Sequence, residues 1–152
     1  MREQGMRSHF MAEVERHGLD RVVELAVNEA LQGPEYLYLS FDIDVLDPAY
    51  APGTGTPEPG GFTTREMFPV IRRLCHEAHV VGFEVVEVAP NLDHGYTTAL
   101  NANRVIVEAI TGLAMRKQKL PGGGYLDSVT SGDEAFARPR PPANQPTLED
   151  NA

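Results

Sequence analysis

Two short apolar segments with a helix between them constrain the fold of this chain most strongly. They cover residues 36–44 and 80–88, and both are rich in the β-branched and aromatic residues that favour strands. Between them, Thr63 and Glu66 have the spacing of a capping box, which predicts the start of an amphipathic helix. Pro69 is expected to kink that helix or delay its start. A strand, a helix and a second strand in this order predict a parallel α/β unit.

Two further helices and one short strand are expected from the hydrophobic pattern. Residues 20–31 place apolar side chains at helical spacing and end just before Gly33. Residues 98–115 form the last predicted helix, and a short strand is expected near residues 5–10. The inward face of the last helix is assigned to Ile106, Val107, Ile110 and Leu113.

Composition divides the chain into a folded part, residues 1–118, and a tail, residues 119–152. Proline, glycine and polar residues dominate the tail, so we expect it to be disordered. The formal net charge of -9 argues against a nucleic-acid partner. No apolar run approaches the roughly 20 residues that cross a bilayer, which argues against a membrane protein. The single cysteine, Cys75, is expected to be a small buried hydrophobe, and the cytoplasm is the expected compartment.

Acidic residues stand where both predicted strands end. In sheets of this type, ligands bind beyond the carboxyl ends of the strands. Asp42 and Asp44 are two apart, so in a strand they would point to the same face. Two carboxylates held close together suit a hard divalent cation, although a solvated strand end is the alternative. Asp47 precedes a proline and by itself is read as a turn residue.

The second strand carries Glu84 and Glu87, which face opposite sides if the strand is regular. One of the two can therefore face the first acidic pair. A different chemistry also stays open, because Asp42 could be the nucleophile of an aspartyl-phosphate enzyme. The hydroxyl residue that such phosphatases usually place after the pair is replaced here by Leu46.

The residues around the first strand end resemble the signature of a known enzyme family. Residues 40–48, followed by residues 51–61, are similar to the signature of the ureohydrolases, which include arginases, agmatinases and other guanidino-acid hydrolases. Residues 82–90 resemble the family's last sheet strand, and residues 10–18 resemble the segment before the signature. The similarity covers roughly residues 5–117.

The resemblance implies a role for each acidic residue. Asp42 would bridge two metal ions, usually Mn²⁺, and Asp44 would bind one of them. Glu87 would be the catalytic carboxylate that faces the guanidinium group of the substrate. Thr56 would line the substrate pocket, and Asp47 would support the loop and the metal shell. The implied reaction begins with a metal-activated water and yields urea and an amine.

The family pattern is present only in part. The family takes its remaining metal ligands from two earlier histidine-containing motifs, which do not occur in this sequence. We therefore expect a partial three-layer α/β/α sandwich that lacks the N-terminal half, binds metal weakly and has little activity alone. The alternative is a non-catalytic truncated homologue that acts as an interaction or regulatory subunit. A homo-oligomer is expected of the full-length form.

The substrate is expected to be agmatine or a guanidino acid such as guanidinobutyrate. Residues 52–61 are closer to agmatinases and guanidino-acid hydrolases than to arginases. However, Tyr96 stands where agmatinases commonly carry an acidic residue.

Overall fold

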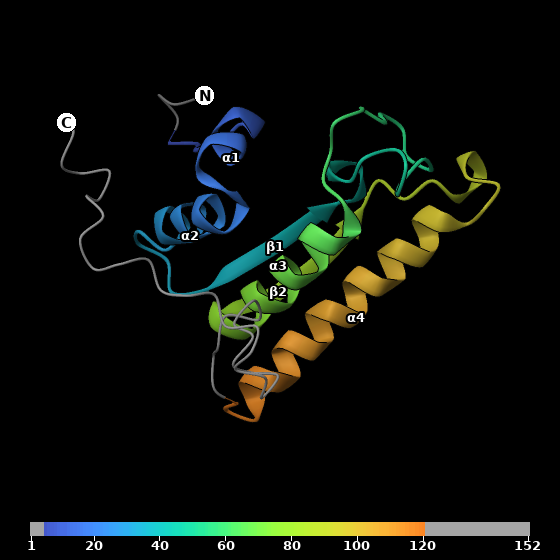
Figure 1. Ribbon diagram of the computed structural model, residues 1–152. Coiled ribbons are helices and arrows are strands. Elements are labelled where there is room, and N and C mark those ends of the chain that lie inside the picture. The colour runs from blue at the N-terminus through green and yellow to red at the C-terminus, as the bar shows by residue number, and fades with distance from the viewer. Residues whose placement is uncertain (1–4, 121–152) are drawn as a thin grey trace, which may run out of the picture. The chain divides into compact units, whose positions relative to one another are not determined.

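The computed structural model describes residues 5–120, shown as the coloured ribbon in Figure 1. These residues form helices, a pair of strands and two short 3-10 helices. In chain order the elements are α1 (Met11–His17), α2 (Leu19–Ala30), β1 (Leu37–Asp42), η2 (Ile43–Val45), α3 (Thr64–Glu77), β2 (Val80–Val86), η3 (Pro90–Leu92) and α4 (Thr97–Lys117).

The two strands pair in parallel, as the order of elements predicts. The register places Leu37 beside Val80, and one extra residue in β2 then brings Tyr38 level with Gly82. From that point the pairing is regular to the end of β1, where Asp42 lies beside Val86. Both strands are two residues shorter at their carboxyl ends than the sequence predicts. The difference matters because the acidic residues that follow are not held in strand geometry.

The side chains of β1 alternate between a buried and an exposed face. Leu37 and Leu39 are partly buried and Phe41 is fully buried, whereas Tyr38 and Ser40 are exposed. Phe41 belongs to a core that also includes Met67, Val70 and Ile71 of α3 and Val105 and Ala109 of α4. The helices therefore cover one face of the β1–β2 pair.

A capping box starts α3, as predicted. The Thr63 hydroxyl accepts a hydrogen bond from the Glu66 amide at 3.2 Å, and the Glu66 carboxylate accepts one from the Thr63 amide at 2.8 Å. The helix begins at Thr64 and continues through Pro69 to Glu77, so the expected delay is wrong. Cys75 on its inner face is fully buried, and burial raises the pKa of its thiol to about 11.

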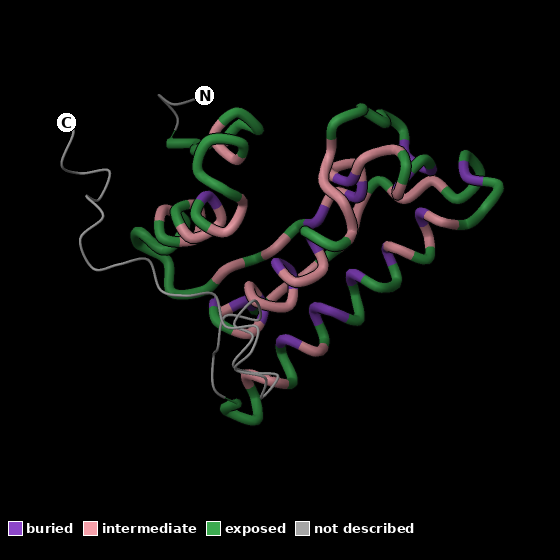
Figure 2. The backbone as a smooth tube through the Cα atoms, viewed as in Figure 1, coloured by how far each residue is buried: buried purple, intermediate pink, exposed green. Residues whose placement is uncertain are grey.

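The predicted inward face of α4 is wrong. Ile106, Val107, Ile110 and Leu113 are between 37% and 60% exposed. The buried positions, which recur along α4 in Figure 2, are mostly smaller side chains. They are Thr98, Ala102, Val105, Glu108, Ala109 and Gly112. Hydrophobicity alone misassigned the face because the close approach of α4 to α3 selects side chains by size.

The short strand predicted near residues 5–10 is absent, so that prediction is wrong. A strand needs a neighbour for its backbone groups, and no strand lies beside this segment among the described residues. Almost all of the predicted tail, residues 121–152, lies outside the described residues. No helix within residues 5–120 is long and apolar enough to cross a membrane.

The contact between α3 and α4 leads to a test of Gly112. A Cβ added there would lie 2.8 Å from the Cβ of Cys75 and would also meet the carbonyl oxygen of Arg72. In an open helix, glycine to alanine gains up to about 1 kcal/mol. Here the overpacking cost of about 1–3 kcal/mol outweighs that gain. We expect Gly112→Ala to lower the melting temperature measured by circular dichroism. The exposed substitution Asn103→Ala, on the same helix, serves as the control and should leave it unchanged or slightly raised; an equal rise in Gly112→Ala would contradict the close contact.

Candidate functional site

The acidic residues after the two strands lie at one edge of the sheet. β1 ends at Asp42, and β2 ends at Val86, one residue before Glu87. Because Asp42 is level with Val86 in the parallel register, Glu87 follows immediately beyond it. Burial raises the pKa of Asp42, and the negative charges of Asp44 and Glu87 raise it further. The fold thus brings together the three carboxylates that the sequence singles out.

The structure gives a different reason for the closeness of Asp42 and Asp44 than the one predicted. Strand alternation does not operate, because Asp44 lies in the 3-10 helix η2. Asp42 instead caps this helix: its carboxylate accepts a hydrogen bond from the Asp44 amide at 3.1 Å. This hydrogen bond fixes the backbone between the two carboxylates, because the side chain of Asp42 is bonded to the amide of Asp44, which carries the second carboxylate.

Thr56 reaches the same edge from a distant part of the sequence. Its hydroxyl donates a hydrogen bond to the carboxylate of Asp44 at 2.7 Å. The preceding residue, Gly55, approaches Glu87: a Cβ built on Gly55 would lie 3.8 Å from a Glu87 carboxylate oxygen. The loop thus passes close to both Asp44 and Glu87, and its exposed Thr56 contacts the acidic cluster directly.

Asp47 closes the loop on which Thr56 lies. Its carboxylate accepts hydrogen bonds from the amides of Ala49 and Gly60, both at 2.9 Å. These bonds hold the pKa of Asp47 below its usual range. Asp47 therefore ties the beginning of the loop to its end.

A buried polar network, which the sequence reasoning missed, holds the middle of the loop. The Gly53 amide donates to the Thr98 hydroxyl at 2.7 Å, and the Gly53 carbonyl accepts from the Ala89 amide at 2.8 Å. Asp93 accepts from the Thr98 amide at 2.6 Å, which holds the pKa of Asp93 below its usual range. A Cβ on Gly53 would lie 2.6 Å from that of Asp93, so no other residue fits. Only the position of Thr98 at the start of a helix could have indicated the network from sequence.

The electrostatics of the cluster suit a divalent cation. Within residues 5–120, no lysine, arginine or histidine forms an ion pair with Asp42, Asp44 or Glu87. Carboxylate oxygens are also the donors that Mg²⁺ and Mn²⁺ prefer. In the same part of the chain, however, no three histidine, cysteine or acidic side chains form a set that could hold an ion. The residues fit such a metal in chemical kind but not in number.

Glu87 has an unusual backbone. Its φ angle is 64°, in the left-handed region that residues with a side chain seldom adopt. Such conformations concentrate at functional sites, where the surrounding structure maintains them. The residue leaves strand geometry at this point, and its side chain is exposed beyond the end of β2.

Comparison with known proteins decides the family. Residues 1–112 match the sequence profile of the arginase family. The chain belongs to the arginase family. This arginase-family chain is 44% identical over 90 residues to the agmatinase of Chromobacterium violaceum, which covers 59% of this chain and 27% of that protein. It is 42% identical over 113 residues to the guanidinopropionase of Pseudomonas aeruginosa, covering 74% of this chain and 35% of that protein.

Solved structures agree with the family assignment. The formimidoylglutamase of Bacillus subtilis superimposes with a TM-score of 0.71 at 28% identity, over 75% of this chain and 36% of that one. The proclavaminate amidino hydrolase of Streptomyces clavuligerus gives 0.66 at 38% identity, over 76% and 38%. The chain therefore has part of the arginase-like α/β fold and spans about a third of the length of its relatives.

The raised pKa of Asp42 predicts how the metal-free chain responds to pH. The folded chain holds this proton more tightly than the unfolded chain, whose aspartate pKa is about 3.9. The contribution of Asp42 to the free energy of unfolding is therefore lost as the pH rises from about 3.9 through the pKa of Asp42 in the folded chain. Asp42→Asn removes this loss and keeps an oxygen for the Asp44 amide. We expect it to melt at a higher temperature than the wild type at neutral pH with a chelator present, by a margin that shrinks toward about pH 4.

Calorimetry over this pH range measures the effect. Glu35→Gln removes one negative charge just before the amino end of β1 and should give no such gain. If Asp42→Asn melts lower than the wild type at neutral pH, the carboxylate is not under electrostatic strain and the interpretation is wrong.

The buried network predicts the effect of Thr98→Val. This change leaves the Gly53 amide buried without an acceptor, at a cost of about 1–3 kcal/mol. We expect a lower free energy of unfolding and faster hydrogen exchange at Gly53 and its neighbours. Thr111→Val is the matched control on α4, because its hydroxyl bonds only to the Val107 carbonyl on the exposed side. Equal effects of the two substitutions would contradict the network.

Proposed function

We propose that this chain supplies the carboxylate part of a metal-dependent site that hydrolyses a guanidino compound to urea and an amine. The observation that carries the proposal is the meeting of Asp42, Asp44 and Glu87 beyond two parallel strands of an arginase-family fold. The three negative charges have no cationic side chain paired with them among residues 5–120, so a bound cation would relieve their repulsion.

Asp42 and Asp44 are the residues proposed to hold Mn²⁺. Asp42 is tied to the backbone of η2, and Asp44 is oriented by the hydroxyl of Thr56, so both carboxylates are placed before a metal binds. A hydrogen bond to a ligating carboxylate commonly sets its orientation and its affinity for metal. When bound, the divalent ions would supply a water of lowered pKa as the nucleophile.

Glu87 is proposed to bind the guanidinium group. A carboxylate accepts charge-assisted, paired hydrogen bonds from a planar guanidinium. The position of Glu87 supports this role: it stands beside Asp42 yet is exposed, and the loop passes it with a glycine, Gly55, that leaves space there. Thr56 and Gly55 would then line the same side of the substrate.

The substrate is proposed to be agmatine or a guanidino acid such as guanidinobutyrate. Relatives with near-equal identity carry different names: agmatinase at 44%, guanidinopropionase at 42% and arginase at 40%. Identity therefore does not distinguish the substrates. Tyr96 is a candidate residue for substrate selection, because its side chain is 69% exposed on the turn that follows Asp93.

A second candidate is a non-catalytic subunit that regulates or binds another protein. The small number of metal donors within residues 5–120 favours it, since a chain with this donor set alone would bind metal weakly. The phosphatase alternative loses support, because the family assignment concerns a different class of hydrolase.

Titration of the full chain with Mn²⁺ tests the metal role. We expect weak binding, seen as loss of the free Mn²⁺ signal in electron paramagnetic resonance. Asp42→Asn or Asp44→Asn should abolish it, and Thr56→Val should weaken it about tenfold, as loss of a supporting hydrogen bond commonly does. Glu35→Gln is the control for the loss of one charge. Equal binding by Asp42→Asn and Glu35→Gln would contradict the proposal.

The role of Glu87 is tested in the same titration. With Mn²⁺ present, Glu87→Gln should weaken the binding of guanidinobutyrate or agmatine about tenfold, the effect of losing a charged hydrogen-bond partner. Glu84→Gln, in β2 just before Glu87, is the matched control, because Glu84 interacts with Tyr38 instead. A similar loss in both variants would indicate general electrostatics rather than a contact with Glu87.

A further inference from the structure

Helices α1 and α2 meet at a single glycine. Gly18 ends α1 and precedes α2, and its φ angle of 85° lies in the left-handed region that favours glycine. A Cβ added there would meet nothing within 4 Å, so no neighbouring side chain packs against this junction. In Figure 1, α1 turns back beside α2 at this point. A glycine between two helices, with open space around it, is a suitable hinge.

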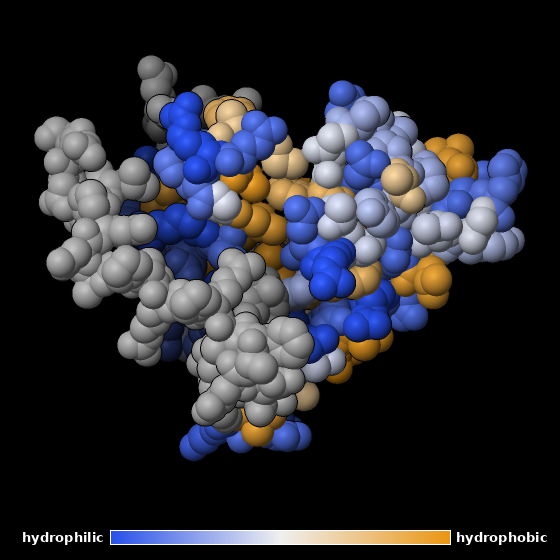
Figure 3. Space-filling model, in the orientation of Figure 1, coloured by the Kyte–Doolittle hydropathy of each residue, from blue (hydrophilic) through white to orange (hydrophobic). Residues whose placement is uncertain are grey.

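Apolar packing holds α2 in place but not α1. Leu19, Val23 and Val27 of α2 pack against the core, whereas among the described residues none of α1 is buried or belongs to that packing. The apolar hollow beside α2, orange in Figure 3, is lined by α2, β1 and α3 and by no residue of α1. α1 has only 7 residues, fewer than the roughly 12–15 that an isolated helix needs. It therefore depends on its polar contacts.

The main polar contact of α1 is made by His9, which lies just before the helix. Its Nε2 lies 3.1 Å from a carboxylate oxygen of Glu29, near the end of α2. Its Nδ1 lies 3.4 Å from a carboxylate oxygen of Glu13 on α1 and has no further hydrogen-bond partner among the described residues. The His9 side chain is only 17% exposed. The imidazole thus stands between two carboxylates and joins the start of α1 to α2.

The protonation state of His9 determines whether both contacts are favourable. An imidazolium ion has an N–H group on each ring nitrogen and can donate to Glu29 and Glu13 together. A neutral imidazole has one N–H group, so its second nitrogen directs a lone pair at a carboxylate oxygen. Histidine side chains lose the second proton between about pH 5 and 8. Both contacts are therefore favourable below this range, and one of them is lost as the pH rises through it.

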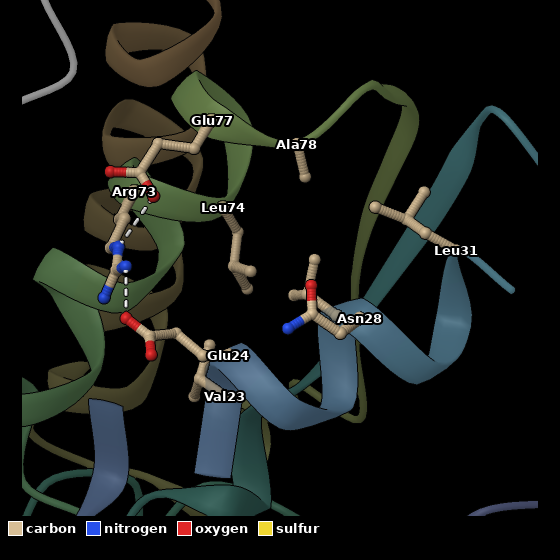
Figure 4. A pocket seen from close by; sticks show the side chains of 9 residues that line it. Val23, Glu24, Asn28, Leu31, Arg73, Leu74, Glu77 and Ala78 are labelled. Atoms are coloured by element: carbon tan, nitrogen blue, oxygen red, sulfur yellow. Dashed lines mark hydrogen bonds and ion pairs between the residues drawn. The ribbon is translucent and has the colours of Figure 1, made fainter. Parts of the chain in front are cut away.

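The attachment of α2 to α3 does not change in the same range. Arg73 of α3 lies 2.8 Å from Glu24 and 3.7 Å from Asp20 of α2, and 2.8 Å from Glu77 of its own helix. Figure 4 shows Arg73 with Glu24 and Glu77 beside it. Hydrogen bonds to Glu24 and Glu77 hold the pKa of Arg73 above its usual range, so it stays charged. Ordinary carboxyl groups are ionised above about pH 5, so these ion pairs remain when His9 loses its proton.

We propose that His9 forms a pH-dependent link that holds α1 against α2 when protonated and releases α1 at the Gly18 hinge when neutral. The charged groups that face His9 are Glu13 from α1 and Glu29 from α2. His17, in the last turn of α1, titrates over the same range, and a positive charge there stabilises the carboxyl end of a helix. A test must therefore separate the two histidines.

Amide hydrogen exchange of the full chain tests the link, with a chelator present so that the outcome is independent of the proposed metal site. Protection factors, corrected for the intrinsic pH dependence of exchange, are compared at about pH 5.5 and about pH 8. The amides of Val14 and Gly18 report on α1, because they donate to the carbonyls of Phe10 and Val14. We expect their protection to fall about tenfold at the higher pH, as for the loss of a charged hydrogen bond. The amides of α4 should keep their protection.

Three substitutions identify the responsible group. His9→Gln carries no titrating proton, so Val14 and Gly18 should show the same low protection at both pH values. Glu29→Gln removes the charge on α2 and should lower protection at about pH 5.5. His17→Gln is the matched control and should keep the whole difference. Circular dichroism checks that each variant still folds, and nitrogen-15 spectra of wild-type His9 should show N–H groups on both ring nitrogens at the lower pH.

Several results would overturn the link. These are equal protection of α1 in the wild type at the two pH values, a difference that persists in His9→Gln, or a difference that disappears in His17→Gln. The last result would assign the pH dependence to the carboxyl end of α1 instead. An equal fall in the amides of α4 would indicate general unfolding, and a His9 ring with one N–H group at the lower pH would exclude the double contact.

Discussion

The parallel pairing of β1 and β2 is the interaction on which the candidate site depends. It places Asp42 level with Val86, so that Glu87, the first residue after the second strand, follows at the same edge. No direct bond between the two acids is needed, because the backbone ladder holds them in place. The helices contribute by burying Phe41 and its neighbours on one face, which keeps the pair together in a sheet too small to be stable by its own hydrogen bonds.

The loop between β1 and α3 adds the second level of organisation. Asp47 ties its ends together, Gly53 ties its middle to Thr98, and Thr56 reaches back to Asp44. Each tie uses a polar group that the surrounding structure orients, so a segment rich in proline and glycine is held without helix or strand. The chemistry of the site therefore depends on α4 as well, since its first turn provides the acceptor for Gly53.

Sequence reasoning located the α/β unit, the capping box of α3 and the acidic residues, because each follows from a local pattern. It failed where distance or shape decides. The closeness of Asp42 and Asp44 comes from a cap on η2, and not from strand alternation. The inner face of α4 is chosen by the tight approach at Gly112, so that larger side chains such as Ile110 point outward. The Gly53–Thr98 bond joins residues 45 positions apart, and only the place of Thr98 at the start of a helix gives a local sign of it.

The extra residue near the start of β2 has an effect at the other end of the sheet. If Val81 paired regularly with Tyr38, each later residue of β1 would be level with a residue one position earlier in β2, so Asp42 would be level with Val85. Glu87 would then stand about 3.3 Å further along the strand direction, and the side chains of the two strands would no longer match face to face. A register irregularity far from the carboxylates thus sets their spacing, and Val81 is the unpaired residue that makes this register possible.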